Sequence, residues 1–106
     1  MNRGDVYWVD LNPTQGSEIN KQRPCVIVGA TPINRARNTV VVVPLSTAAR
    51  SRPPIVISVQ CLGKQVAAIC DQIRTVDKSR FMKSAGKLST EDMDILDDSL
   101  RQILSL

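Results

Sequence analysis

The chain has 106 residues and a formal net charge of +4, and 42% of its residues are hydrophobic. These values are typical of one globular domain spanning residues 1–106, and they exclude a disordered chain. The positive charge favours a polyanionic partner, but with one Trp, one Tyr and one Phe the chain is poorly suited to bind nucleic acid through many stacked bases.

The first half of the chain contains three predicted strands. Residues 5–11 and 25–30 are expected to be strands, and a polar turn and loop begins at residues 12–17 between them. Residues 39–45 are almost continuously Val, which predicts a buried strand.

The second half begins with a polar and basic loop at 46–54. Residues 55–59 and 65–70 are predicted to form a hairpin, and 71–76 a further extended segment. Five or six short strands with a terminal helix predict a small, strongly curved barrel of mainly β (α+β) class.

Two short helices are predicted between these strands. Thr31 and the Pro that follows it indicate the start of a helix that ends near Asn38. Asp77 is expected to cap a second short helix through Phe81, with Gly86 marking its end.

The last segment is predicted to be an amphipathic helix. Ser89 followed by Asp92 resembles a capping box, and acidic residues fill the first turn. The apolar residues at three- and four-residue steps are Met93, Leu96, Leu100, Ile103 and Leu104. This stripe is expected to pack on the core; a partner or dimer surface is the alternative.

The three cysteines, Cys25, Cys61 and Cys70, lie in apolar runs and form no CxxC pair. They are therefore expected to be reduced, buried thiols of a cytoplasmic protein. The chain has no His, so a metal site is not predicted, and no cofactor is expected. No apolar stretch approaches the ~20 residues of a membrane span, so no membrane partner is expected.

Arg23 precedes an unbroken apolar run that begins after Pro24. A guanidinium at the mouth of a buried strand is suited to bind a phosphate or carboxylate, because its charge is permanent and its donors have fixed geometry. The alternative is a solvated cation flanking a strand.

Several short segments resemble the MazF/PemK toxin family in their order and spacing over nearly the whole chain. These segments are Arg3-Gly4-Asp5-Val6-Tyr7, Asn12-Pro13-Thr14 with Gly16-Ser17-Glu18, Arg23-Pro24, Asn34-Arg35, Val43-Pro44-Leu45-Ser46-Thr47 and Asp71-Gln72-Ile73-Arg74-Thr75-Val76-Asp77. The resemblance implies an SH3-like barrel of the CcdB/MazF type that forms a homodimer. It also implies metal-independent cleavage of single-stranded RNA by attack of the 2′-hydroxyl, and inhibition by a cognate antitoxin with a disordered tail.

The resemblance assigns four catalytic candidates. Arg23 matches the family's phosphate-binding Arg, and Ser46 occupies the position of its functional Thr. Glu18 and Asp71 are the carboxylates available as bases; their alternatives are a solvated loop acid and a strand-end residue bonded to loop amides. Arg23 is also a candidate proton donor, although a guanidinium holds its proton so tightly that this role is chemically demanding.

Five further residues are expected to contact the substrate: Ser17, Thr47, Arg50, Arg52 and Gln72. The loops 12–22 and 48–54 should flank the RNA groove. Arg50 and Arg52 would contact RNA backbone or bases there, or else be solvated loop cations.

The chain departs from the family at two positions. Some PemK-like members have His where this chain has Ser17, and Arg where it has Ile69, so an acid–base scheme using that pair cannot operate here. Two other functions stay open: a non-enzymatic, gyrase-binding toxin of the CcdB kind, and a catalytically inactive nucleic-acid-binding member.

Overall fold

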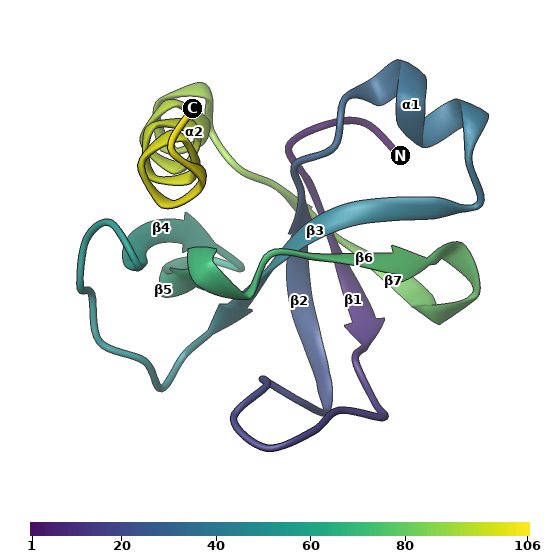
Figure 1. Ribbon diagram of the computed structural model, residues 1–106, viewed down its shortest axis with the longest axis horizontal. Coiled ribbons are helices and arrows are strands. Elements are labelled where there is room, and N and C mark those ends of the chain that lie inside the picture. The colour runs from purple at the N-terminus through teal and green to yellow at the C-terminus, as the bar shows by residue number, and fades with distance from the viewer.

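The computed structural model describes residues 1–106 and shows one curled, antiparallel sheet with a helix packed against it (Figure 1). The strands are β1 (Asp5–Asp10), β2 (Gln22–Ile27), β3 (Thr39–Ser46), β4 (Val56–Cys61), β5 (Lys64–Ile69), β6 (Arg74–Asp77) and β7 (Phe81–Lys87). The helices are α1 (Thr31–Ala36) and α2 (Thr90–Leu104), and 3-10 turns cover Cys70–Gln72 (η1) and Lys78–Arg80 (η2). The strand order is β4-β5-β3-β2-β1-β7, and β6 pairs with β3. The predicted curved barrel with a C-terminal helix is confirmed.

Strand β3 pairs with three other strands along its length. Its first half pairs with β6, its middle with β2, and its last two residues, Leu45 and Ser46, with β5. Its side chains are buried on both faces, Val43 and Leu45 in one apolar cluster and Val40 and Val42 in another, which explains its nearly unbroken run of Val.

The curled sheet encloses two apolar clusters. The larger lies between the β4–β5 hairpin, β3 and α2, and includes Leu45 and Leu96, both fully buried. The smaller lies between β1, β2, β3 and β6, and Tyr7 and Phe81 pack against it with ring centroids 5.6 Å apart. Cys25 is fully buried in this second cluster, as its apolar surroundings predicted.

Helix α2 begins as predicted and covers the larger cluster. The Ser89 hydroxyl accepts a hydrogen bond from the Asp92 amide at 3.1 Å. The Asp92 carboxylate does not complete a capping box, because it accepts from the Gln60 amide of β4 at 2.8 Å. Of the predicted apolar stripe, Leu104 is the exception: it remains 48% exposed.

The segment after η2 corrects the expected helix through Phe81. Asp77 does cap a turn, accepting from the Ser79 amide at 2.9 Å, but the turn ends at Arg80. Residues Phe81–Lys87 then pair with the free edge of β1, with register shifts that bend the strand. The positive φ of Gly86 (105°) belongs to this irregular pairing and not to a helix end.

Two further expectations need correction. Strand β2 begins at Gln22, so Arg23 lies within it, opposite Val9, and not before it. Backbone pairing thus extends past the apolar run from which the strand was predicted. Thr31 does not cap α1; its hydroxyl accepts from the Arg3 amide at 2.9 Å.

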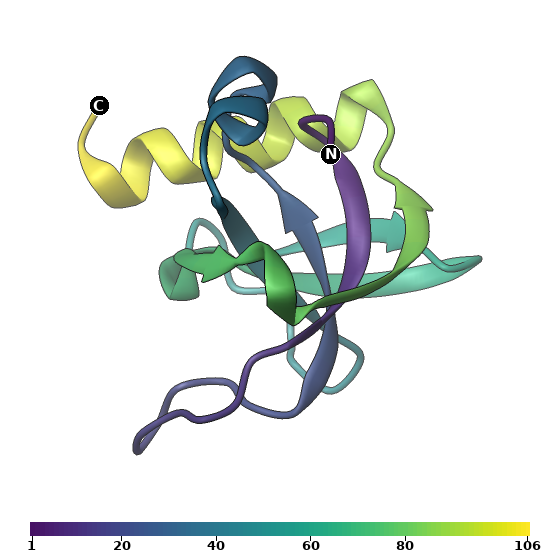
Figure 2. The same cartoon turned by 90° about the vertical axis from the view of Figure 1, so that its right-hand side faces the viewer.

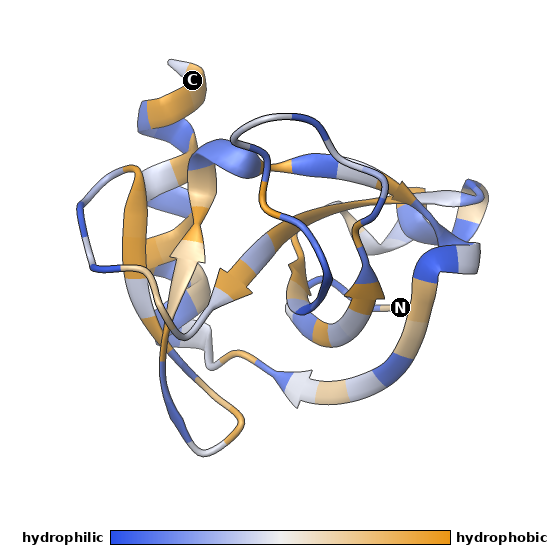
Figure 3. Cartoon of the chain, turned by 90° about the horizontal axis from the view of Figure 1, so that it is seen from below, coloured by the Kyte–Doolittle hydropathy of each residue, from blue (hydrophilic) through white to orange (hydrophobic).

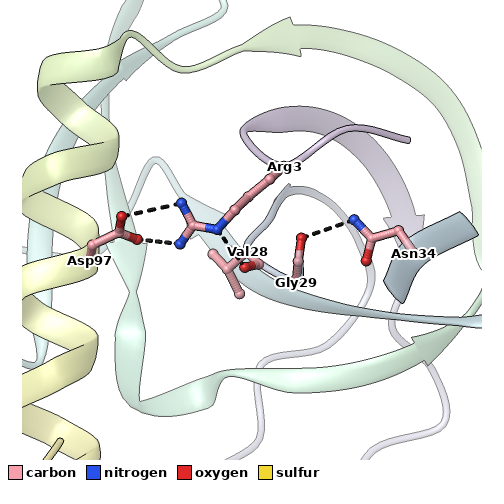
Figure 4. Close-up of polar contacts among 5 residues, drawn as sticks. All are labelled: Arg3, Val28, Gly29, Asn34 and Asp97. Carbon is pink, nitrogen blue, oxygen red and sulfur yellow. Dashed lines mark hydrogen bonds and ion pairs between the residues drawn. The ribbon is translucent and has the colours of Figure 1, made fainter. Parts of the chain in front are cut away.

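Arg3 joins the N-terminal turn to α2 (Figure 4). Its Nε donates to the Val28 carbonyl at 2.8 Å, and both of its terminal nitrogens donate to the Asp97 carboxylate. Beside it, the buried Asn34 amide of α1 donates to the Gly29 carbonyl at 2.9 Å. These contacts hold both helices to the end of β2.

We expect Arg3→Ala to lower the free energy of unfolding by about 1 kcal/mol, because the ion pair is partly exposed and one backbone hydrogen bond is lost with it. Urea denaturation of Arg3→Ala, Asp97→Asn and the double variant would measure the coupling. Asp98→Asn is the matched control, since Asp98 bonds only Gln102 of the same helix. Equal stability of Arg3→Ala and Asp98→Asn would contradict the assignment.

Candidate active site

Seven of the nine predicted site residues line two surface depressions. The first, of about 320 Å³, lies where the ends of β1, β2 and β3 meet the β4–β5 hairpin. It is lined by Trp8, Gln22, Arg23, Pro24, Leu45, Ser46, Thr47, Leu62, Lys64 and Val66. The second, of about 560 Å³, is lined by Ser17, Glu18, Asp71, Gln72, Ile73, Arg74 and Thr75. The four catalytic candidates are therefore divided: Arg23 and Ser46 border one depression, Glu18 and Asp71 the other.

Arg23 presents a guanidinium with no carboxylate partner. Its Nε donates to the Asn20 carbonyl at 2.8 Å, and the only ion pair of the structure is that of Arg3 with Asp97. The four N–H donors of its two terminal nitrogens make no hydrogen bond within the protein, so they are available to an anion.

Ser46 ends β3 beside Arg23. The pairing of β2 with β3 ends at Cys25 and Pro44. Arg23 and Ser46 each lie two residues beyond this last pair, and both line the first depression. Ser46 is buried, and its oxygen accepts from the Ala48 amide at 3.1 Å, which leaves its O–H free to donate. Thr47, next in the chain, is exposed.

The loop between β1 and β2 carries Ser17 and Glu18. It projects from the end of the molecule at which the 47–55 loop also lies (Figures 1 and 2), and Figure 3 shows it from that end, with mostly hydrophilic residues. The exposed Glu18 carboxylate accepts from the Gln15 amide at 2.6 Å, which shapes the tip of the loop.

Gln72 ties this loop to η1. Its side-chain oxygen accepts from the Ile19 amide at 2.5 Å, and its nitrogen donates to the Ser17 carbonyl at 3.3 Å. Both polar atoms of its side chain are thus bonded to the loop backbone. This favours a role in holding the loop, and not the contact with substrate that was predicted.

The fully buried Cys25 lines neither depression. It lies beneath Arg23, two residues along the same strand face, and burial raises the pKa of its thiol to about 12, although the charges of Arg74 and Arg23 act to lower it. Arg74 pairs with Val42, which pairs with Ile27, and Arg23 is four residues before Ile27 on the same strand. Arg74 of the second depression and Arg23 therefore lie on the same side of the sheet. The Cys25 thiol itself stays protonated and is no nucleophile at neutral pH.

Arg50 and Arg52 lie on the exposed 47–55 loop and line neither depression. Sequence reasoning missed Trp8, Lys64 and Arg74 as lining residues. Arg74 belongs to the Asp71–Asp77 segment that resembles the MazF/PemK family, so that resemblance could have indicated it. No neighbouring residue distinguished Trp8 from a core residue. No three Cys, Asp or Glu side chains are grouped so as to hold a metal ion.

Residues 2–104 match the family described as PemK-like, MazF-like toxins of type II toxin–antitoxin systems. The chain belongs to this toxin family. It is 36% identical over 115 aligned positions to Endoribonuclease MazF9 of Mycobacterium tuberculosis, covering 100% of this chain and 98% of that protein.

Solved structures of similar proteins agree with the toxin fold. A mycobacterial endoribonuclease in complex with its cognate antitoxin superposes with a TM-score of 0.84 at 25% identity, covering 100% of this chain and 96% of that one. MazF from Deinococcus radiodurans superposes with a TM-score of 0.89 at 18% identity, covering 100% and 97%, a likeness in fold alone. The expected MazF-type barrel is confirmed. No helix of the toxin is both long and apolar enough to cross a membrane.

We expect Gln72→Ala to release the β1–β2 loop. Loss of a hydrogen bond worth about 1 kcal/mol should speed hydrogen exchange at the Ile19 amide roughly fivefold to tenfold, with global stability nearly unchanged. Gln72→Glu keeps the acceptor for Ile19 and should exchange more slowly than Gln72→Ala. Gln60→Ala, at an exposed strand position, is the control. Unchanged exchange at Ile19 in Gln72→Ala would show that the tie does not order the loop.

We expect Cys25 to resist thiol reagents at pH 8 in the folded protein and to react on unfolding. Its folded pKa of about 12 lies above the ordinary 9.0, so the folded state keeps a proton that the unfolded state loses. The resulting stability is complete below about pH 9 and is lost as the pH rises toward 12. The difference in unfolding free energy between wild type and Cys25→Ala should therefore narrow from pH 9 to 11. Full labelling of native Cys25 at pH 8 would refute the burial argument.

Proposed function

We propose that this toxin is a ribosome-independent endoribonuclease that cuts single-stranded RNA at short sequences without a metal ion. The observation that carries the proposal is Arg23, a guanidinium free of any carboxylate, beside the donor-ready hydroxyl of Ser46 on the adjoining strand end. The similarity over the full chain to Endoribonuclease MazF9, and to the mycobacterial endoribonuclease, supports the same activity.

The proposed reaction uses the RNA's own 2′-hydroxyl as nucleophile. Its oxygen forms a bond to the adjacent phosphorus as the bond from phosphorus to the 5′-oxygen breaks. The 2′-proton passes to a base, and the leaving 5′-oxygen takes up a proton. The products are a 2′,3′-cyclic phosphate and a 5′-hydroxyl end.

Arg23 would stabilise the negative charge that develops on the non-bridging phosphate oxygens, and the Ser46 hydroxyl would donate to the same group. Glu18 and Asp71, which line the second depression, are the proposed bases. With no imidazole in the chain, no side chain has an unperturbed pKa near 7. Catalysis would then rest mainly on positioning and electrostatic stabilisation, and turnover should be slow.

The biological role follows from the proposed activity. Cleaved mRNA would block translation and growth in the cytoplasm, and a small acidic antitoxin would neutralise the toxin. The toxin would act as a homodimer. The antitoxin bound to the solved mycobacterial endoribonuclease supports the protein partner.

We expect purified toxin to cut long single-stranded RNA in EDTA at discrete sites, and Arg23→Ala to slow cutting about 100-fold or more, because one charge-stabilising group is lost. Primer extension would map the cuts. Ser46→Thr should retain activity and Ser46→Ala should lose much of it. Glu18→Gln and Asp71→Asn in the same assay would identify the base.

Arg35→Ala, at an exposed position on α1, is the matched control and should cut like wild type. Absence of cutting by folded wild-type protein would exclude the enzyme. DNA breaks that require gyrase would then support the gyrase-binding alternative. RNA binding without cutting would support the catalytically inactive, nucleic-acid-binding alternative.

A further inference from the structure

Trp8 is the only tryptophan of the chain, and it belongs to neither apolar cluster. It is partly exposed on β1, and it is not among the half-buried side chains that pack against the clusters. Its indole N–H has no partner in the protein. A large aromatic side chain left out of the core of a small domain is informative, since burying it there would stabilise the fold.

Trp8 lies at one end of an apolar row that crosses three strands. It pairs directly with Pro24 of β2, and the register of β2 with β3 places Leu45 next in the row on the same face. Leu62 and Val66 of the β4–β5 hairpin close the other side of the 320 Å³ depression. Leu62, in a turn where it and Gly63 both have positive φ (57° and 73°), is 45% exposed.

The border of this depression is cationic and hydroxyl-bearing. Arg23, Lys64, Gln22, Ser46 and Thr47 all line it, and no acidic side chain does. An apolar, aromatic floor with such a border fits a flat ring attached to an anion, which describes one nucleotide of a single strand.

Strand geometry sets how a nucleotide would lie here. Neighbouring residues of a strand point to opposite faces, so Arg23 faces away from Pro24, and Ser46 away from Leu45. The depression lies at the ends of these strands, where residues of both faces line it, so a phosphate at Arg23 and Ser46 and a base over Trp8 would border the same hollow.

We propose that this depression is a stacking subsite, in which the Trp8 indole holds a base of the RNA next to the cleaved phosphate. This rests on the proposed endoribonuclease function. The cationic border and its continuity with Arg23 favour a base over an apolar side chain of a protein.

The emission of Trp8, which no other tryptophan obscures, measures occupancy directly. The probe is an oligonucleotide of the mapped cut sequence with a 2′-deoxy sugar at the cleavage position, which removes the nucleophile. We expect a saturable emission change that is lost when the bases beside the cleavage position are replaced by abasic sugars.

Variants separate stacking from folding. Trp8→Ala should raise both KM and the Kd of an end-labelled probe about tenfold, with kcat changed less than about twofold, because base–aromatic stacking is lost. Trp8→Phe should restore most of the affinity. Met82→Ala, which removes another half-exposed apolar side chain on β7, is the control and should change neither constant. Circular dichroism would establish that each variant is folded.

The outcomes distinguish this proposal from the proposed function. Cutting by wild type with no emission change, or a folded Trp8→Ala with unchanged KM, overturns the stacking subsite and leaves the nuclease. If the emission changes only when the protein is diluted, the stacking subsite is overturned in favour of contact with a second copy of the chain. If it changes only with an acidic peptide, the subsite is overturned in favour of a protein partner. If nothing is cut, poly(U), poly(A) and poly(C) serve as probes. Quenching of the Trp8 emission by these polymers would support the stacking subsite even though the proposed nuclease activity had been refuted.

Discussion

The double-sided pairing of β3 is the constraint on which the rest of this structure depends. No other strand exchanges backbone hydrogen bonds with three partners, and these partners hold β3 at its beginning, middle and end. On the edge of β3 opposite β2, the partner changes from β6 to β5, and the β4–β5 hairpin then packs with α2 around the larger cluster. This change also brings the end of β3, with Ser46, beside Arg23 and next to the β4–β5 hairpin. The candidate site therefore lies where the sheet changes partners.

The site is completed by a mostly polar loop, in which Ile19 packs against the smaller apolar cluster. Polar ties from the 72–80 segment hold the loop between β1 and β2. Gln72 bonds its middle, while the guanidinium groups of Arg74 and Arg80 donate to carbonyls of Asp10, Leu11 and Asn12 where it begins. Together with Ile19, these ties place Glu18 in the depression that Asp71 also lines. A segment held in this way can be ordered at a small energetic cost and released again.

Much of the fold was predictable because its signals are local. The Val run of β3, the Ser89 cap and the hairpin turn at Leu62 and Gly63 each follow from residue types over a few positions. Strand β7 was not predictable in this way: its polar, Gly-containing sequence becomes a strand only because β1 offers it a free edge. The start of β2 differs from the predicted one for the same reason, since pairing with β1 extends the strand back to Gln22.

For the candidate site, the sequence indicated most of the chemical groups but not how they are grouped. The division of Arg23 and Ser46 from Glu18 and Asp71, and the place of Trp8, depend on long-range register.

The single ion pair of Arg3 and Asp97 has a consequence for measurements in salt. That pair lies away from the site, and the side-chain contacts that hold the loop are hydrogen bonds with backbone atoms, whose strength changes little with ionic strength. Added salt should therefore leave the site's architecture intact while it weakens the attraction of a polyanion. The slope of log affinity against log salt concentration would then count the phosphates that the toxin neutralises, with little contribution from rearrangement of the protein itself.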